Sequence, residues 1–250
     1  MNENLSRDEN VYLAKIYQIA ERYSDMFKCV INFVKIDPNL TLEERNLFLI
    51  SCKSYIADKR ASWRIFNHIE KRDEKKNSQN LVHLKEIKMK LEEELRANCE
   101  EVQILLDKNL VPNSKDFETK VFYLKLKGDF FRFRAEFTYG KEHEQVCLQT
   151  EKSYKDAFEI AEKNVPIFSP TRLGLALNLS IFYYEVKSMK EEACHIARNA
   201  YEEAIKIKDE LKKNKAFESL NLIKLLNENL KLWMGVGVNE LIDHSEKSKN

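Results

Sequence analysis

The stretch YLKLKGDFFRFRAEF, residues 123–137, places two cations seven positions apart, Lys125 and Arg132. Seven residues are close to two turns of an α-helix, so both side chains are expected on one face of a helix. Phe133 follows the arginine directly. This segment therefore predicts a helix with a basic face beside an aromatic residue.

A second segment repeats the arrangement. In RNLFLISCKSYIADKRASWRIF, residues 45–66, Lys53 and Arg60 are again seven apart. If the two helices pack side by side, Arg60 and Arg132 could converge on one small anion, since guanidinium groups suit the paired oxygens of a phosphate. The alternative is two solvated faces, which the spacing alone favours because such charged pairs are common on exposed helices.

The composition favours a helical protein. The 250 residues include only 5 Gly and 4 Pro, while 33% are charged. That combination is typical of long amphipathic helices and predicts an all-α fold rather than a sheet. The net charge of +1 gives no global field for binding nucleic acid. We therefore expect no nucleic-acid partner.

Capping signals and prolines divide the chain into helices. Thr41 and Glu44 match a capping box, and Ser169 before Pro170 suits a helix start. Between such breaks the apolar residues recur at spacings of three and four. We expect nine antiparallel helices, at about residues 4–20, 22–36, 41–70, 79–109, 115–138, 146–164, 170–187, 190–208 and 214–234.

The sequence predicts one domain over residues 1–234, followed by a flexible tail at 235–250. Residues 71–80, KRDEKKNSQN, are expected to form a charged turn. Five scattered cysteines without CxxC spacing are typical of a reduced, intracellular protein. No apolar run of about 18 residues exists to span a membrane. We expect a soluble cytoplasmic protein that does not insert into membranes.

The chain shows no catalytic signature. It lacks HExxH, G-x-S-x-G and a glycine-rich phosphate loop. His143 and Cys147 lie four residues apart, but two ligands do not make a metal site. We therefore expect neither a catalytic residue nor a metal or cofactor, and an enzyme is a distant alternative.

Two further helices carry polar residues suited to holding a peptide. Asn178 and Glu185 are seven apart on one helix, and Asn229 and Trp233 are one turn apart on the last. An amide side chain can bond both the donor and the acceptor of an extended backbone. The accompanying apolar residues are Leu177, Ile181, Leu222 and Leu225. Asparagine on such a face is more often a cap or a core polar group, but its mid-helix position favours a groove with one basic and one apolar wall.

The quoted segments, together with PTRLGLALNLSIFYYEV at 170–186, resemble the signature helices of the 14-3-3 family of phosphopeptide-binding adaptors. LLNENLKLW at 225–233 resembles the family's last-helix motif, and AERYSDM at 20–26 its first corner between helices. The resemblance implies nine helices in a concave cup, a homodimer or heterodimer, and an amphipathic groove for phosphoserine or phosphothreonine peptides.

The resemblance also assigns residues to the groove. Lys53, Arg60 and Arg132 match the family's phosphate-binding positions. The matched peptide contacts are Lys125, Asn178, Glu185, Asn229 and Trp233, and the matched apolar wall is Leu177, Ile181, Leu222 and Leu225.

A further set matches the family's dimer interface. Arg22 and Asp25 match one side of its ion pairs, and Lys90 and Glu94 match the other. The matched packing contacts are Ile16, Ala20, Ser62, Ile65, Ile69 and Ile87. Since exposed ion pairs contribute little, the apolar residues are expected to hold the dimer.

Three positions depart from the family pattern. Phe133 stands where the family has a tyrosine beside its phosphate-binding arginine, so one hydroxyl donor is lost. Losing a hydrogen bond to a charged group costs about 1.5–3 kcal/mol, which weakens binding without abolishing it. Asn221 replaces a leucine of the apolar wall, and Ile87 replaces a tyrosine at the dimer contact.

The expected function is that of a dimeric, non-catalytic adaptor that binds phosphorylated proteins or peptides and regulates them. The alternative is a helical scaffold that binds unphosphorylated peptides or acts mainly through dimerisation, with a degraded phosphate clasp.

Overall fold

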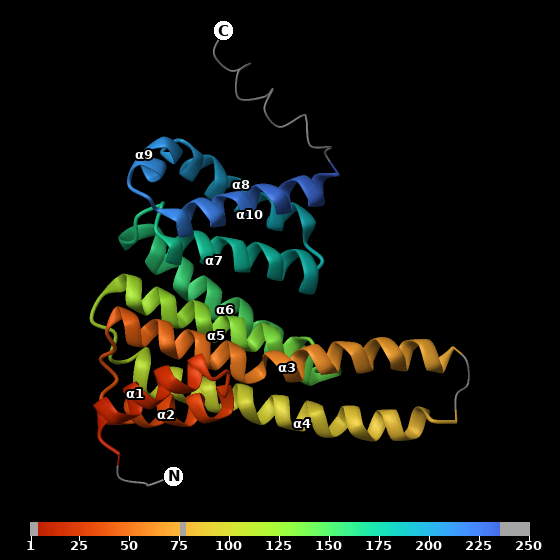
Figure 1. Ribbon diagram of the computed structural model, residues 1–250. Helices are drawn as coiled ribbons and strands as arrows, with labels where there is room; N and C mark the ends of the chain where they lie inside the picture. The colour runs from red at the N-terminus through yellow and green to blue at the C-terminus, as the bar shows by residue number, and fades with distance from the viewer. Residues whose placement is uncertain (1–4, 76–78, 236–250) are drawn as a thin grey trace. The chain divides into compact units, whose positions relative to one another are not determined.

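The computed structural model describes residues 5–75 and 79–235. These residues form ten α-helices and two π-helical segments and contain no β-strand, which confirms the all-α fold (Figure 1). None of the described helices is both long enough and apolar enough to cross a membrane.

The contacts divide the chain into two compact units. The first comprises residues 1–115 and 133–146, and the second comprises 116–132 and 147–250. Helices α5 (Phe117–Ala135) and α6 (Gly140–Asn164) each contribute to both units. The expectation of a single domain over residues 1–234 stays a prediction. The predicted tail lies, apart from Gly235, outside the described residues.

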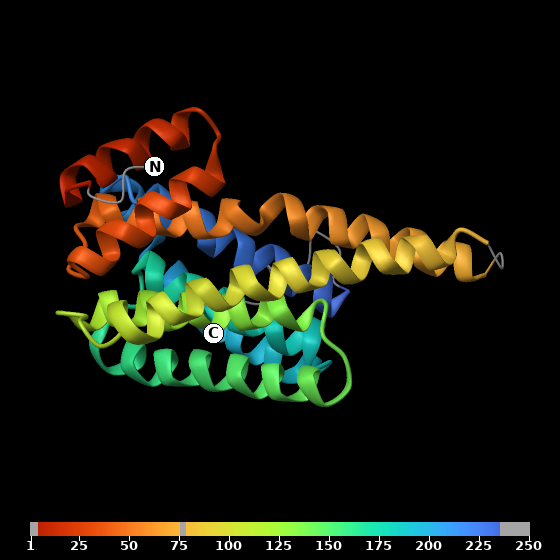
Figure 2. The ribbon, with the colours of Figure 1, turned by 90° about the horizontal axis from the view of Figure 1, so that it is seen from below.

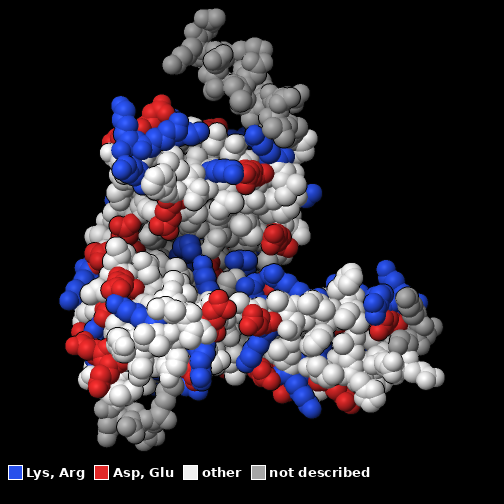
Figure 3. Space-filling view, in the orientation of Figure 1, with Lys and Arg blue, Asp and Glu red and all other residues white. Residues whose placement is uncertain are grey.

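The other helices of the first unit are α1 (Arg7–Ile19), α2 (Tyr23–Ile36), α3 (Leu42–Glu74) and α4 (Leu81–Leu105), with a π-helical segment at Leu106–Leu110. The long helices α3 and α4 lie side by side in both views, as do α1 and α2 (Figures 1 and 2). Basic and acidic side chains are intermixed over α3 and α4 on the face drawn in Figure 3. This mixture agrees with the small net charge of the whole chain.

Capping chemistry fixes the starts of α1 and α3. Ser6 and Thr41 each cap a helix through a capping box, with Glu9 and Glu44 as the returning carboxylates. The predicted Thr41 cap is thus confirmed. Arg7 adds a bidentate pair to Glu44 at 2.7 and 2.9 Å, and the Glu44 side chain is only 8% exposed. One carboxylate therefore satisfies the amide at the start of α3 and joins this helix to α1.

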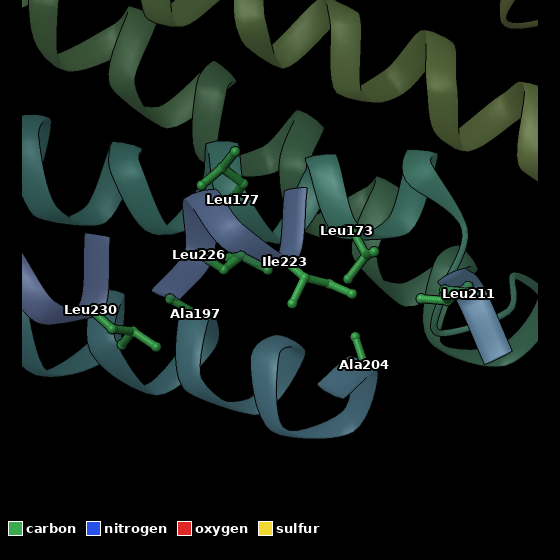
Figure 4. Close-up of a cluster of buried hydrophobic side chains, with 8 residues drawn as sticks. All are labelled: Leu173, Leu177, Ala197, Ala204, Leu211, Ile223, Leu226 and Leu230. Atoms are coloured by element: carbon green, nitrogen blue, oxygen red, sulfur yellow. The ribbon is translucent and has the colours of Figure 1, made fainter. Parts of the chain in front are cut away.

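The second unit adds α7 (Pro170–Ile181), α8 (Lys190–Ile205), α9 (Lys208–Lys213) and α10 (Phe217–Met234), with a π-helical segment at Phe182–Val186. The predicted cap of α7 is confirmed, because Ser169 Oγ accepts from the backbone N–H of Thr171 at 3.1 Å and Pro170 is the first helical residue. Figure 4 shows the apolar cluster that joins α7, α8 and α10, with Leu211 from α9 at its edge. Burial of these side chains supplies the main favourable term for this packing.

Several predicted boundaries are wrong. The charged turn is shorter than residues 71–80, because α3 continues to Glu74 before α4 begins at Leu81. Residues 208–213 form a helix of their own, since Ile207 leaves helical geometry with a ψ of 13°. The described residues therefore contain ten α-helices rather than nine.

Helix α6 starts earlier than the sequence predicts. This helix begins at Gly140 rather than near residue 146. Its first turns carry polar side chains, so the apolar spacing that marks a helix is absent there. Glu142 in the first turn instead accepts hydrogen bonds from Arg96 at 3.0 Å and Arg134 at 3.3 Å. These ion pairs hold a helix end that the apolar pattern does not reveal.

Candidate functional site

Arg60 is held in a fixed orientation within the first unit. Its Nε and Nη2 donate to the two carboxylate oxygens of Glu136 at 3.3 and 2.5 Å. Its guanidinium carbon lies 3.8 Å from the centre of the Phe133 ring. Among the described residues, Nη1 has no hydrogen-bond partner, so a second edge of the guanidinium remains able to donate. Arg60 thus presents an oriented, fork-shaped donor.

Phe133 is more than a tyrosine position without its hydroxyl. In the structure its side chain is buried, and its ring stacks against Arg60. A cation over a desolvated aromatic face is stabilised by up to about 2 kcal/mol. The ring therefore supports the arginine even though it offers no donor of its own.

Arg64 shares the carboxylate of Glu136. Its Nη2 donates to the same oxygen that Arg60 uses, at 3.0 Å, but its own side chain is 60% exposed. Lys53, two turns before Arg60 on α3, is also exposed. The predicted cationic face of α3 is therefore present, with Arg60 as its most enclosed member.

In the second unit a buried carboxylate, Asp129, gathers predicted groove residues. Its oxygens accept hydrogen bonds from Lys125 Nζ at 3.2 Å, from Asn178 Nδ2 at 2.6 Å and from Tyr154 OH at 2.6 Å. The Tyr154 hydroxyl in turn accepts from Arg132 Nε at 3.4 Å. The structure thus brings Lys125, Asn178 and Arg132 into one hydrogen-bond network, whose centre is not evident from the sequence.

Tyr154 remains a proton donor in this network. Burial raises the pKa of its hydroxyl well above the ordinary value, and the nearby Asp129 carboxylate raises it further. The ring fits against α5 because Gly128 has no Cβ: a methyl group there would lie 2.5 Å from the ring. A glycine inside a helix costs about 1 kcal/mol relative to alanine. Gly128 therefore lowers the helix propensity of α5 but allows the Tyr154 ring to pack closely against it.

The residues of the predicted apolar wall differ in their burial. Leu177 belongs to the buried cluster of Figure 4, and Ile181, Leu222 and Trp233 are half-buried against that cluster. Leu225 is instead 44% exposed. The Trp233 ring also stacks on Tyr184, with centroids 4.6 Å apart.

The remaining groove positions are more open. Asn229 is half-buried, while Glu185 and Asn221 are exposed. Asn221, which replaces an apolar residue of the family pattern, therefore causes no buried polar defect in this chain.

The positions expected at a dimer interface are largely exposed on the first unit. Ile16, Ile65 and Ile87 are 42%, 59% and 53% exposed. Further apolar side chains outside this set are also exposed on α1 and α4, namely Tyr12, Ile19, Val82 and Met89. The first unit therefore exposes apolar side chains on α1, α3 and α4.

Three of the four charged residues of the same set have partners within the first unit. Arg22 pairs with Asp25, and Glu94 pairs with Lys59 at 2.9 Å. The hydrogen bond from Arg22 lowers the pKa of Asp25, with a smaller contribution from Lys28. Lys90 is exposed, Ala20 is exposed, and Ser62 and Ile69 are half-buried.

The chemistry of His143 and Cys147 is that of structural residues. His143 Nδ1 lies 3.1 Å from the carbonyl oxygen of Ala135, and burial raises the pKa of the Cys147 thiol. Over the described ranges, no three His, Cys, Asp or Glu residues gather in a way that could hold a metal ion.

The sequence of this chain is similar to those of known proteins of one family. The family model described as 14-3-3 protein matches residues 13–234. The chain is 44% identical to 14-3-3 protein 10 of Solanum lycopersicum over 92% of this chain and 93% of the tomato protein. It is 42% identical to the checkpoint signal transducer rad24 of Schizosaccharomyces pombe, over 91% and 85% of the two chains. It is 41% identical to the 14-3-3-like protein GF14 omicron of Arabidopsis thaliana, over 97% and 95%.

Proposed function

Because the chain belongs to the 14-3-3 family, we propose that it is a dimeric adaptor that binds segments containing phosphoserine or phosphothreonine and thereby regulates its partners. Members of this family are non-catalytic adaptors that bind phosphorylated partners. The proposed site of action is the cytoplasm. Neither nucleic acid nor the membrane interior is a proposed partner, and no cofactor is required.

The proposed phosphate ligands are Lys53, Arg60 and Arg132. The observation that carries the proposal is the state of Arg60, which has one edge on Glu136, one face on Phe133 and a further edge that can still donate. A dianionic phosphate accepts charge-assisted bonds from such an edge without the cost of ordering the side chain. Lys53 would add a point charge rather than a planar fork.

The proposed peptide contacts follow from the same family match. Lys125, Asn178 and Asn229 would bond the extended backbone, with Glu185 and Trp233 nearby. The apolar side chains Leu177, Ile181, Leu222 and Leu225 would contact the residues that flank the phosphate. Polar groups that fix the backbone, combined with an apolar wall, suit many different partner sequences.

Dimerisation is the second part of the proposal. The exposed apolar residues Ile16, Ile65 and Ile87 support it, because pairing would remove them from water. Ala20, Ser62 and Ile69 would complete the packing, with Arg22, Asp25, Lys90 and Glu94 at its charged rim. Two linked sites would raise the affinity for doubly phosphorylated partners through effective concentration.

A titration of arginine variants tests the phosphate clasp. Arg60→Ala should weaken binding of a phosphoserine peptide by at least about 2 kcal/mol, or roughly thirtyfold, since it removes a charge-assisted donor from a dianion. Arg132→Ala should have an effect of similar size. The matched control is Arg72→Ala, which removes an exposed arginine from the same helix as Arg60. A loss for Arg60→Ala no greater than the loss for this control would contradict the proposal.

A further inference from the structure

Asp129 is the least accessible charged group in the second unit's hydrogen-bond network. Its side chain is 1% exposed, whereas that of Lys125 is 15% exposed. Burying an ionised carboxylate is costly unless charged and polar donors surround it. Here one ammonium group from α5, one phenol from α6 and one amide from α7 donate to it. Asp129 therefore accepts hydrogen bonds from side chains on three helices.

The amide of Asn178 is oriented by this arrangement. An asparagine amide has two N–H donors on Nδ2 and an acceptor on Oδ1. Because Asp129 can only accept while it is ionised, it selects the orientation in which Nδ2 faces it, at 2.6 Å. Oδ1 then points away from the carboxylate, and no described residue donates a hydrogen bond to it. Asn178 is thus held in an orientation in which its Oδ1 can accept a hydrogen bond from a ligand.

Tyr154 prevents the network from relaxing into another pattern. Its hydroxyl donates to the same Asp129 oxygen that Asn178 uses, and its ring is locked against Gly128. The carboxylate consequently cannot turn toward solvent without leaving buried donors unsatisfied, which is costly. The orientation of the amide therefore follows from rigid packing as well as from charge.

We infer that Asp129 is a positioning residue for peptide binding: it holds the Asn178 amide so that Oδ1 accepts one backbone N–H of the bound segment. The inference rests on the proposed function and deepens it, because it assigns a direction to a peptide contact. It also assigns Asp129 a role that requires no contact with the ligand.

Backbone ester substitution tests this direction. In a phosphoserine peptide, each amide near the phosphoserine is replaced in turn by an ester, which removes one N–H and retains the shape of the chain. In the wild-type protein, one ester position should weaken binding by about threefold to tenfold, the loss of one neutral hydrogen bond. Asp129→Asn should reduce that penalty to less than about twofold, because a neutral amide can also donate to Asn178 and no longer selects one orientation. Asp156→Asn, an exposed control on α6, should leave the penalty unchanged.

A merely structural role for Asp129 predicts a different result. In that case Asp129→Asn would weaken every peptide by the same factor and leave the ester penalty as it is, and this outcome would overturn the inference. A wild-type protein that binds the phosphopeptide but shows no ester penalty at any position would also overturn it. If the wild type binds no phosphopeptide, the proposed function itself fails and the inference fails with it.

A second measurement covers the case in which Asp129→Asn does not fold. The side-chain amide signals of Asn178 in the wild-type protein can be assigned by their loss in Asn178→Ala. Binding of the all-amide peptide should shift these signals, whereas the penalised ester peptide should shift them far less. Equal shifts with both peptides would overturn the inference without any change at Asp129.

Discussion

Phe133→Tyr should tighten phosphopeptide binding, because it adds a hydroxyl donor beside the proposed phosphate site. The substitution keeps the aromatic ring, so the stacking of Arg60 at 3.8 Å is retained. Any change in affinity therefore reports on the hydroxyl rather than on the position of the arginine.

The size of the gain follows from the charge of the acceptor. A hydrogen bond to a charged group contributes about 1.5–3 kcal/mol, which corresponds to a roughly tenfold to hundredfold lower Kd. Phe133 is only 6% exposed, so in the free protein the new hydroxyl loses part of its hydration. This loss adds to the advantage of the bound state but lowers the stability of the free protein. A water that already bridges the gap in the wild type would reduce the gain.

The assay is a fluorescence anisotropy titration with a labelled phosphoserine peptide at fixed ionic strength. Phe131→Tyr is the matched control, because Phe131 lies on the same helix and is 7% exposed. Two residues turn a helix by about 200°, so its hydroxyl points to another face. Thermal denaturation of each variant shows whether both remain folded.

The reasoning would be refuted if Phe133→Tyr and Phe131→Tyr were both folded and bound the phosphopeptide with the affinity of the wild type. Tighter binding of the unphosphorylated serine peptide by the same factor would refute it as well. The hydroxyl is expected to act on the phosphate alone.

Three further predictions concern assembly and stability. Ile65→Asp should shift the protein from dimer to monomer in sedimentation velocity, because it places a charge at a proposed apolar contact, and an unchanged dimer would contradict this. Glu44→Gln should lower the free energy of unfolding by about 1.5–3 kcal/mol at pH 7, since Arg7 loses a bidentate carboxylate. Burial raises the pKa of Glu44, but hydrogen bonds from Arg7 and Thr41 outweigh this effect and lower the pKa below its ordinary 4.5. The ionised carboxylate therefore contributes to the free energy of unfolding above pH 4.5, and this contribution is lost as the pH falls through the lowered pKa. Urea denaturation near pH 3 should show a smaller difference in the free energy of unfolding between Glu44→Gln and the wild type than at pH 7. The same difference at both pH values would contradict this. Gly128→Ala should lower the thermal midpoint despite its better helix propensity, because the added methyl would meet the Tyr154 ring at 2.5 Å, at a cost of about 1–3 kcal/mol; a raised midpoint would contradict it.

The helix boundaries can be predicted from the sequence where neighbouring residues determine them. Capping boxes, prolines and apolar spacing depend on neighbours within a few residues, and they located the starts of α3 and α7 correctly. The start of α6 was missed because ion pairs between residues far apart in the chain hold it. The short helix α9 was missed because its break at Ile207 involves no proline or glycine.

The cations of the proposed site could be selected from the sequence, but the carboxylates that bind them could not. Arg132 and Glu136 are four residues apart, which suggests a pair along one helix. In the structure Glu136 binds Arg60, 76 residues away in the chain. Asp129, four residues after Lys125, does follow the local rule. Its burial and its bonds to Asn178 and Tyr154 depend on tertiary packing, which no local pattern reveals.

The most direct test of the central claim compares one peptide with its phosphorylated form. Isothermal titration of the wild-type protein with a phosphoserine peptide and with its serine twin measures what the phosphate contributes. Charge-assisted contacts from Arg60 and Arg132 alone predict that the phosphopeptide binds at least about a hundredfold more tightly than its twin. Equal affinity for the two peptides would contradict the adaptor proposal and favour a scaffold that does not recognise phosphate.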